Sequence, residues 1–215
     1  MDTKRLLGTA VLATGLAACA VTASPPVDPL AQTQYIFFDD FSQPNVHALE
    51  ASGWTLRRAP GHPGIPGAQW GPGTIALVPD THQSGNQLLR LQARTDGRPG
   101  GTVQAQICHT RKYLEGTYAA RIRFSDEPVS GDDGDVVVQS FYTVSPLRYD
   151  FDPEFSEVDF EYLPNGGWGS PCTRLYSIAW QTVRVEPWDA HNAAKETFAH
   201  FAGWHWAAAV EARGA

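Results

Sequence analysis

The sequence predicts an all-β fold, an antiparallel sandwich or barrel, on three observations. Glycine (20), proline (16) and tryptophan (7) are plentiful in a chain of 215 residues, as is typical of turn-rich β proteins. Short segments that alternate apolar and polar residues recur between Gly, Pro, Asp and Asn. No helical period is apparent in residues 35–189. The length suits one domain with a sizeable core.

The predicted strands follow one another along the chain, each bounded by turn residues. Alternation predicts strands over residues 85–94, 101–110 and 116–126, and two longer apolar segments predict strands over 134–144 and 174–186. Strands that are half-buried leave one face of a sheet to solvent. If such a sheet is curved, that face becomes a groove suited to an extended ligand.

The N-terminus has the pattern of an export signal. Lys4 and Arg5 precede an apolar stretch over residues 6–18, which is too short to span a bilayer. The stretch ends in Leu-Ala-Ala-Cys, which resembles the bacterial lipobox and predicts lipidation at Cys19; ordinary cleavage after Ala20 is the alternative. We therefore expect a signal peptide over residues 1–19, a flexible linker over 20–34 and one domain over 35–215.

The net charge of the chain limits the classes of molecule that it is expected to bind. The formal net charge is −7 and the pI is near 5.4, and no basic patch is apparent, so we expect no nucleic-acid partner. An acidic surface also disfavours anionic polymers as substrates, whereas a neutral polymer is compatible with it. We expect an exported bacterial monomer, either secreted or at the cell surface, that contacts the membrane only through a lipid on Cys19.

Two cysteines lie within the predicted domain, Cys108 and Cys172. Export permits a disulfide between them, which would close a long loop and contribute on the order of 4 kcal/mol. Two buried free thiols are the alternative, and the sequence does not decide between them.

Three carboxylates alternate with apolar residues in the segment FSEVDFEYL. In a strand, Glu157, Asp159 and Glu161 share one face, while Val158 and the aromatic residues after it point toward the packed layer. Like charges at this spacing repel one another and raise at least one pKa. Because the arrangement costs stability, it invites a functional explanation.

Glycoside hydrolysis with retention is one such explanation, since it needs a nucleophilic carboxylate and a carboxylic acid roughly 5 Å apart. Cα atoms at i and i+4 of a strand are about 13 Å apart, a gap that two Glu side chains can largely close. Three alternatives stay open: a solvated strand face, which the spacing alone favours, a cation site, and a sugar-binding surface without catalysis.

The segment Glu-Val-Asp-Phe-Glu over residues 157–161 resembles the Glu-x-Asp-x-Glu signature of glycoside hydrolase family 16, which includes the β-glucanases called lichenases and laminarinases. Residues 113–126, 135–143 and 175–182 resemble strands of that family in the same order. The opening segment FFDDF and the segment GWTL over residues 53–56 also resemble this family. The resemblance covers about residues 35–205.

This resemblance implies a concanavalin-like jelly-roll β-sandwich of two antiparallel sheets, with the signature on the concave sheet. It implies that Glu157 is the nucleophile, that Asp159 assists electrostatically and that Glu161 is the general acid/base. The implied function is an exported, endo-acting, retaining glycosidase that cleaves β-glucan-type polysaccharides. A non-catalytic glycan-binding jelly roll and a truncated, inactive family member are the alternatives. No cofactor or catalytic metal is expected, although many family members hold a structural calcium.

Aromatic residues near the signature are candidates for stacking on sugar rings. Trp168 and Trp180 flank the acidic strand, and one of Phe141 and Tyr142 is expected to face the groove. For any single aromatic residue, a place in the core is the alternative. Asn165 is a candidate donor to a sugar hydroxyl, or a residue that simply supplies a turn.

The C-terminal sequence departs from the family pattern. FAHFAGWHW begins like a family strand but continues into the Ala-rich sequence AAAVEARGA, where the family's aromatic strand and Asp-Gly turn do not follow. We therefore expect a domain that is incomplete at its C-terminus, with sheet edges left unpaired.

Overall fold

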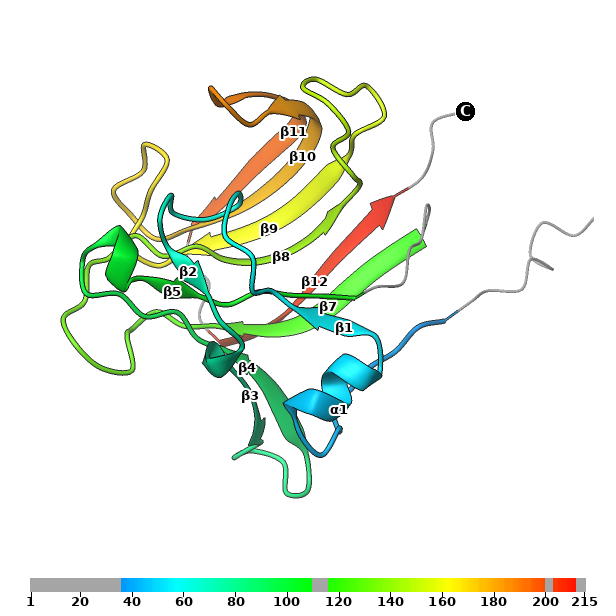
Figure 1. Cartoon of the computed structure of the whole chain (residues 1–215), viewed down its shortest axis with the longest axis vertical. Helices are drawn as coiled ribbons and strands as arrows, with labels where there is room; N and C mark the ends of the chain where they lie inside the picture. The colour runs from blue at the N-terminus through cyan, green and yellow to red at the C-terminus, as the bar shows by residue number, and fades with distance from the viewer. Residues whose placement is uncertain (1–35, 110–115, 200–202, 212–215) are drawn as a thin grey trace, which may run out of the picture. The chain divides into compact units, whose positions relative to one another are not determined.

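The computed structural model describes residues 36–109, 116–199 and 203–211, with only the backbone described from residue 193 onward. The chain divides into two compact units, Met1–Asp39 and Asp40–Ala215. Every helix and strand described below belongs to the second unit (Figure 1). The predicted signal peptide, Cys19 and the linker lie outside the described residues.

The prediction of an all-β fold is confirmed, because strands account for almost all the regular structure of the described residues. The only longer helical element among them is α1, with six residues. The elements are α1 (Val46–Ala51), β1 (Trp54–Leu56), β2 (Gln69–Trp70), η2 (Pro72–Thr74), β3 (Ile75–Pro79), β4 (Gln87–Leu91), η3 (Pro99–Gly101), β5 (Val103–Gln104), β6 (Ile107–His109), β7 (Gly116–Phe124), β8 (Gln139–Val144), β9 (Glu157–Leu163), β10 (Arg174–Arg184), β11 (Asp189–Ala199) and β12 (Gly203–Glu211). None of the helices in the described part is long and apolar enough to cross a bilayer.

The largest sheet has four antiparallel strands in the order β11-β10-β9-β8, which run side by side and curve together in Figure 1. The acidic strand β9 is therefore an inner strand with a neighbour on each side. Glu157 pairs with Val144 of β8 and with Trp180 of β10. Two hydrogen-bonded neighbours fix the register, and the register decides which side chains surround the acids.

One face of this sheet packs against β7. Phe124 of β7, Tyr162 of β9 and Leu175 of β10 form a buried cluster, with Phe160 half-buried against it. The Phe124 and Tyr162 rings stack with their centroids 5.1 Å apart. The apolar side chains of β9 thus point toward the layer that contains β7, and its acidic side chains point to the opposite face of the sheet.

The remaining sheets have two strands each: β12-β7, β1-β6 and β3-β4 are antiparallel, and β2-β5 is parallel. Leu49 of α1, Leu56 of β1 and Ile75 of β3 form a second buried cluster. The side chain of Asn45 begins α1 by accepting a hydrogen bond from the Ala48 amide at 2.9 Å. This cluster fixes the end of β1, from which the loop after Leu56 begins.

Three strand predictions need correction. Within the predicted segment 101–110, the described residues form two short strands, β5 and β6, and residues 134–138 precede β8 without forming a strand. In that second segment Val136 and Val138 are exposed, so an apolar run was not sufficient to make a strand. The Ala-rich end, where no further strand was expected, forms β12. Each of its nine residues pairs with β7, because the backbone hydrogen bonds of a ladder do not depend on side-chain type.

Candidate active site

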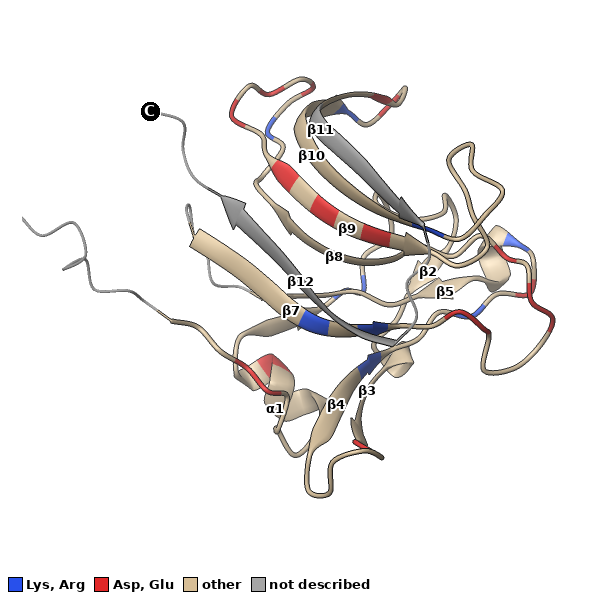
Figure 2. Cartoon of the chain, turned by 180° about the vertical axis from the view of Figure 1, so that it is seen from behind, with Lys and Arg blue, Asp and Glu red and all other residues tan. Residues whose placement is uncertain are grey.

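The three carboxylates lie on the face of the four-stranded sheet opposite the β7 layer, which we call the acidic face. Figure 2 shows them in a line along β9. Their cross-strand neighbours on this face are Trp180, Ile178 and Tyr176 of β10, and Val144, Tyr142 and Ser140 of β8, of which Val144 and Ser140 are exposed. The acids thus lie beside a largely aromatic and apolar row on β10 and a more exposed row on β8, and they are themselves buried or half-buried.

Glu157 and Asp159 form a hydrogen-bonded pair, which we call the acid pair. Burial, and then the charges of Asp159 and Glu161, raise the pKa of Glu157 to about 8. Burial also raises the pKa of Asp159, to about 6, although hydrogen bonds from Trp180 and Glu157 oppose this. Near neutral pH the acid pair therefore shares one proton, which Glu157 carries and donates to Asp159.

Trp180 fixes the orientation of Asp159. Its indole Nε1 donates to Asp159 Oδ2 at 2.6 Å, a charge-assisted hydrogen bond, and only 4% of Asp159 is exposed. Trp180 was predicted to stack on sugar. In the structure its N–H binds the acid pair, and its ring contacts Trp188 edge-to-face with centroids 6.0 Å apart.

Of the two aromatic candidates on β8, Tyr142 lies on the acidic face and Phe141 does not. Phe141 stacks on Phe160, with centroids 6.5 Å apart, on the opposite side of the sheet. Burial and the neighbouring Cys108 raise the pKa of Tyr142, and the negative charge of Glu157 adds to the shift. The phenol therefore stays protonated and is close enough to Glu157 to sense its charge.

Trp168 stands at the tip of a tight hairpin beyond the Glu161 end of β9. Gly167 and Ser170 pair through two backbone hydrogen bonds of 2.8 and 2.9 Å, which leaves Trp168 and Gly169 as a two-residue turn. Both have positive φ, 48° for Trp168 and 88° for Gly169, the pattern of a type I′ turn that favours Asn-Gly. Trp168 is 51% exposed and packs on Tyr176, with centroids 5.1 Å apart.

Asn165 has a structural role in this region. Its amide nitrogen donates to Asp133 Oδ1 at 2.8 Å and to the Asp135 carbonyl at 3.1 Å. These two bonds use both amide hydrogens, so Asn165 ties the hairpin to the loop that precedes β8 and is not poised to donate to a sugar.

The cysteine pair does not form a disulfide. Cys108 and Cys172 are both free and exposed. Cys108 is beside Tyr142, whose Cα partner is Asp159, whereas Cys172 follows the hairpin beyond Leu163. Four residues of strand separate those two places along β9, roughly 13 Å, which is too far for a bridge.

The loop that leads into β9 is anchored by a buried carboxylate. Asp152 is fully buried and accepts two hydrogen bonds from the Arg148 guanidinium, each 2.7 Å long. This pairing lowers the pKa of Asp152, so the carboxylate stays ionised. The Phe151 amide also bonds to the Val183 carbonyl of β10 at 2.9 Å. These bonds therefore hold in place the loop that leads to Glu157, the first residue of β9.

Sequence reasoning missed the residues that surround the acid pair from outside the sheet. Gln106 donates to the Tyr142 hydroxyl, and His62 stacks on Trp188 with centroids 5.4 Å apart. Alternation in residues 101–110 places Gln106 and Cys108 on one polar face, which was the available signal for Gln106. No local pattern marks His62, because its contact joins positions far apart in the chain.

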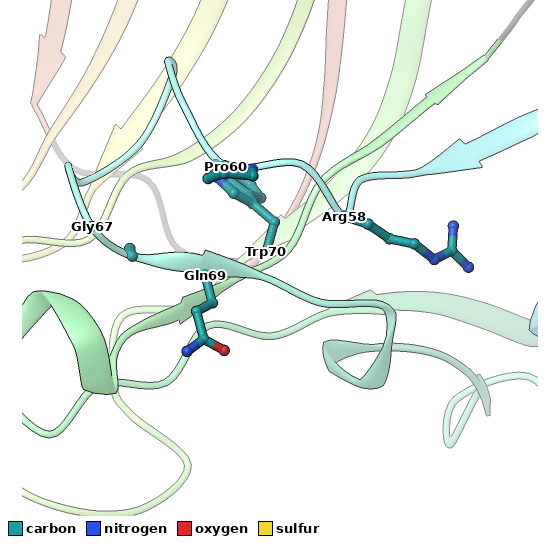
Figure 3. Close-up of a pocket in the computed structure, with 6 residues that line it drawn as sticks. Arg58, Pro60, Gly67, Gln69 and Trp70 are labelled. Atoms are coloured by element: carbon teal, nitrogen blue, oxygen red, sulfur yellow. The ribbon is translucent and has the colours of Figure 1, made fainter.

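The structure also contains a pocket of about 310 Å³ that is separate from the acid pair. It is lined by Arg58, Pro60, Gly67, Ala68, Gln69 and Trp70. In Figure 3, Pro60 lies beside the Trp70 ring, while Arg58 and Gln69 point in other directions. The acids do not line this pocket.

Among the residues that the structure describes, no group of three or more His, Cys, Asp or Glu side chains could hold a metal ion. The expectation that no cofactor is required stays a prediction, as does the structural calcium. Comparisons with protein-family models, with curated proteins and with solved structures found no match to this chain.

Proposed function

We propose that the chain is an exported, endo-acting glycosidase that cleaves β-glucan-type polysaccharides with retention, on a jelly-roll sandwich of the family 16 type. The observation that carries the proposal is the acid pair. Two carboxyls share one proton on a partly buried sheet face, with the Trp180 indole fixing one of them. Glu161 lies next along the same face of the strand. Sharing of a proton between neighbouring acids is typical of catalytic carboxyls.

Because Glu157 carries a proton, it has to release that proton as it attacks the sugar, and this requirement fixes the order of the steps. As a Glu157 oxygen bonds to the anomeric carbon, its proton passes to Asp159, while Glu161, which takes up a proton from solvent before this step, gives that proton to the leaving oxygen. Water then hydrolyses the glycosyl ester, with Glu161 taking a proton from the water and Asp159 returning its proton to Glu157. Asp159 thereby acts as proton acceptor for the nucleophile, which allows Glu157 to attack although its pKa is raised.

One observation favours a second candidate, a glycan-binding protein without catalysis. Trp168 is displayed on a strained hairpin, an arrangement that provides a stacking surface but no chemistry. Binding that persists in the absence of hydrolysis would support this second function.

The test is reducing-sugar release from barley β-glucan and from laminarin. We expect the parent chain to release reducing ends with the β configuration, and Glu157→Gln and Glu161→Gln to lose at least about a thousandfold in kcat. Glu154→Gln is the matched control, because this carboxylate is 76% exposed and pairs only with Arg148 among the described ion pairs. Equal activity in Glu157→Gln and Glu154→Gln would refute the proposal.

A further inference from the structure

Arg57, directly after β1, organises the loop that follows it. The guanidinium uses all five of its N–H donors. Four of them bind backbone carbonyls of the next six residues: Ala59 at 3.0 Å, Gly61 at 2.8 Å, His62 at 3.1 Å and Pro63 at 3.2 Å. The fifth binds Gln106 Oε1 at 2.6 Å, and the guanidinium lies 4.0 Å from the centroid of the Trp70 ring. We call residues 57–64 the Arg57 loop.

The first connection from Arg57 to the acid pair runs through Gln106. Because Gln106 Oε1 accepts from Arg57, the amide must present its Nε2 to Tyr142, and Nε2 donates to the phenol oxygen. The Tyr142 oxygen is then an acceptor on that side, so its O–H is left to donate to another neighbour; Cys108 is within hydrogen-bonding reach, and Glu157 is close enough for its charge to act on the phenol. Arg57 therefore decides which way this chain of hydrogen bonds runs.

A second connection runs through the loop that Arg57 holds. Arg57 binds the His62 carbonyl, and the His62 ring stacks on Trp188 at an interplanar angle of 27°. Trp188 contacts Trp180 edge-to-face, and Trp180 donates to Asp159. The two connections reach the acid pair from β8 and from β10, the two strands that flank β9.

We propose that Arg57 is a positioning residue for the acid pair, acting through Gln106 and Tyr142 on one side and through His62 and Trp188 on the other. It touches neither carboxylate. Its effect on hydrolysis rests on the proposed function, but its effect on the acid pair does not. A side chain with five donors in a fixed plane can bind four loop carbonyls and one amide together, which the three donors of lysine cannot do.

The test compares Arg57→Met and Arg57→Lys with Arg58→Met. Arg58 is the neighbouring arginine, which binds Glu50 at 2.7 Å and the Leu56 carbonyl at 3.0 Å. We expect Arg57→Met to lower kcat by roughly tenfold to a hundredfold with KM changed less than about threefold, and Arg58→Met to change neither by more than about twofold. Arg57→Lys should recover only part of kcat, and it serves as the folded variant if Arg57→Met does not fold.

A second readout does not need activity. The carboxyl ¹³C shifts of Glu157 and Asp159, followed against pH, should move to a different midpoint in Arg57→Met and not in Arg58→Met. In a Tyr142→Phe background, Arg57→Met should have a smaller effect on both readouts, because the first connection is already broken. If the parent hydrolyses no glucan, the proposed function fails, and the ¹³C titration alone decides the positioning role. Midpoints that are unchanged in Arg57→Met, or additive effects in the double variant, would overturn it.

Discussion

Replacing Glu157 with glutamine should make the protein more stable, and increasingly so as the pH rises. In the folded chain the pKa of Glu157 is raised from 4.5 to about 8, chiefly by burial. Below pH 4.5 both the folded and unfolded chains are protonated at this residue. Between pH 4.5 and 8 the unfolded chain releases the proton and the folded chain keeps it, so the free energy of unfolding falls with rising pH. Glutamine keeps the donor toward Asp159 and never ionises, so it avoids this loss.

The magnitude follows from the shift. Each pH unit is worth at most about 1.4 kcal/mol, which gives an upper limit of about 5 kcal/mol by pH 8. Because Glu157 is only half-buried, we expect less than half of this, about 2 kcal/mol, or a difference in Tm of about 4 to 8 °C.

The assay is thermal unfolding of the parent and of Glu157→Gln from pH 5 to pH 8.5, with Glu154→Gln as the exposed control. The difference between Glu157→Gln and the parent should widen with pH, and that of the control should not. If the Glu157→Gln difference is constant within about 1 °C across this range, Glu157 does not hold a proton in the folded chain and the reasoning is wrong.

Three further results are expected. Trp180→Phe removes the hydrogen-bond donor to Asp159 and so raises the pKa of Asp159. The acidic limb of the pH–rate profile should therefore move to higher pH, by about one pH unit. Trp168→Asn gives the turn its preferred residue and should raise the free energy of unfolding by about 1 kcal/mol while weakening polysaccharide binding. Without reductant, iodoacetamide should label both Cys108 and Cys172 in mass spectra of the native chain, because both thiols are free.

Much of the sheet could be predicted from the sequence, because alternation of side chains is a local property. The strand β7 covers nearly the whole predicted segment, and its burial alternates as expected, with Arg121 and Arg123 outward and Phe124 inward. The strand β12 could not be predicted, because its alanines carry no alternation and the strand exists through its pairing with β7. Pairing partners lie far apart in the sequence, so local patterns do not reveal them.

The same distinction applies to the candidate site. The shared face of Glu157, Asp159 and Glu161 follows from a period of two residues, and so could be predicted. The donor from Trp180 to Asp159 could not, since it depends on the register between β9 and β10. The bonds that Arg57 makes depend on loop geometry, which no periodic pattern records.

A line of three like charges would be expensive for a fold, and the structure indicates how the cost is reduced. Burial disfavours each ionised carboxyl, and the closeness of Glu157 to Asp159 disfavours two charges together, so one proton stays with the acid pair. The remaining charge on Asp159 is stabilised by the Trp180 indole and by the proton on Glu157. A neighbouring lysine or arginine is therefore not needed to hold these acids together, and its presence would ionise both members and remove the shared proton. In the proposed reaction that proton moves to Asp159 as Glu157 attacks, so the feature that reduces repulsion in the resting protein also determines the path of the chemistry.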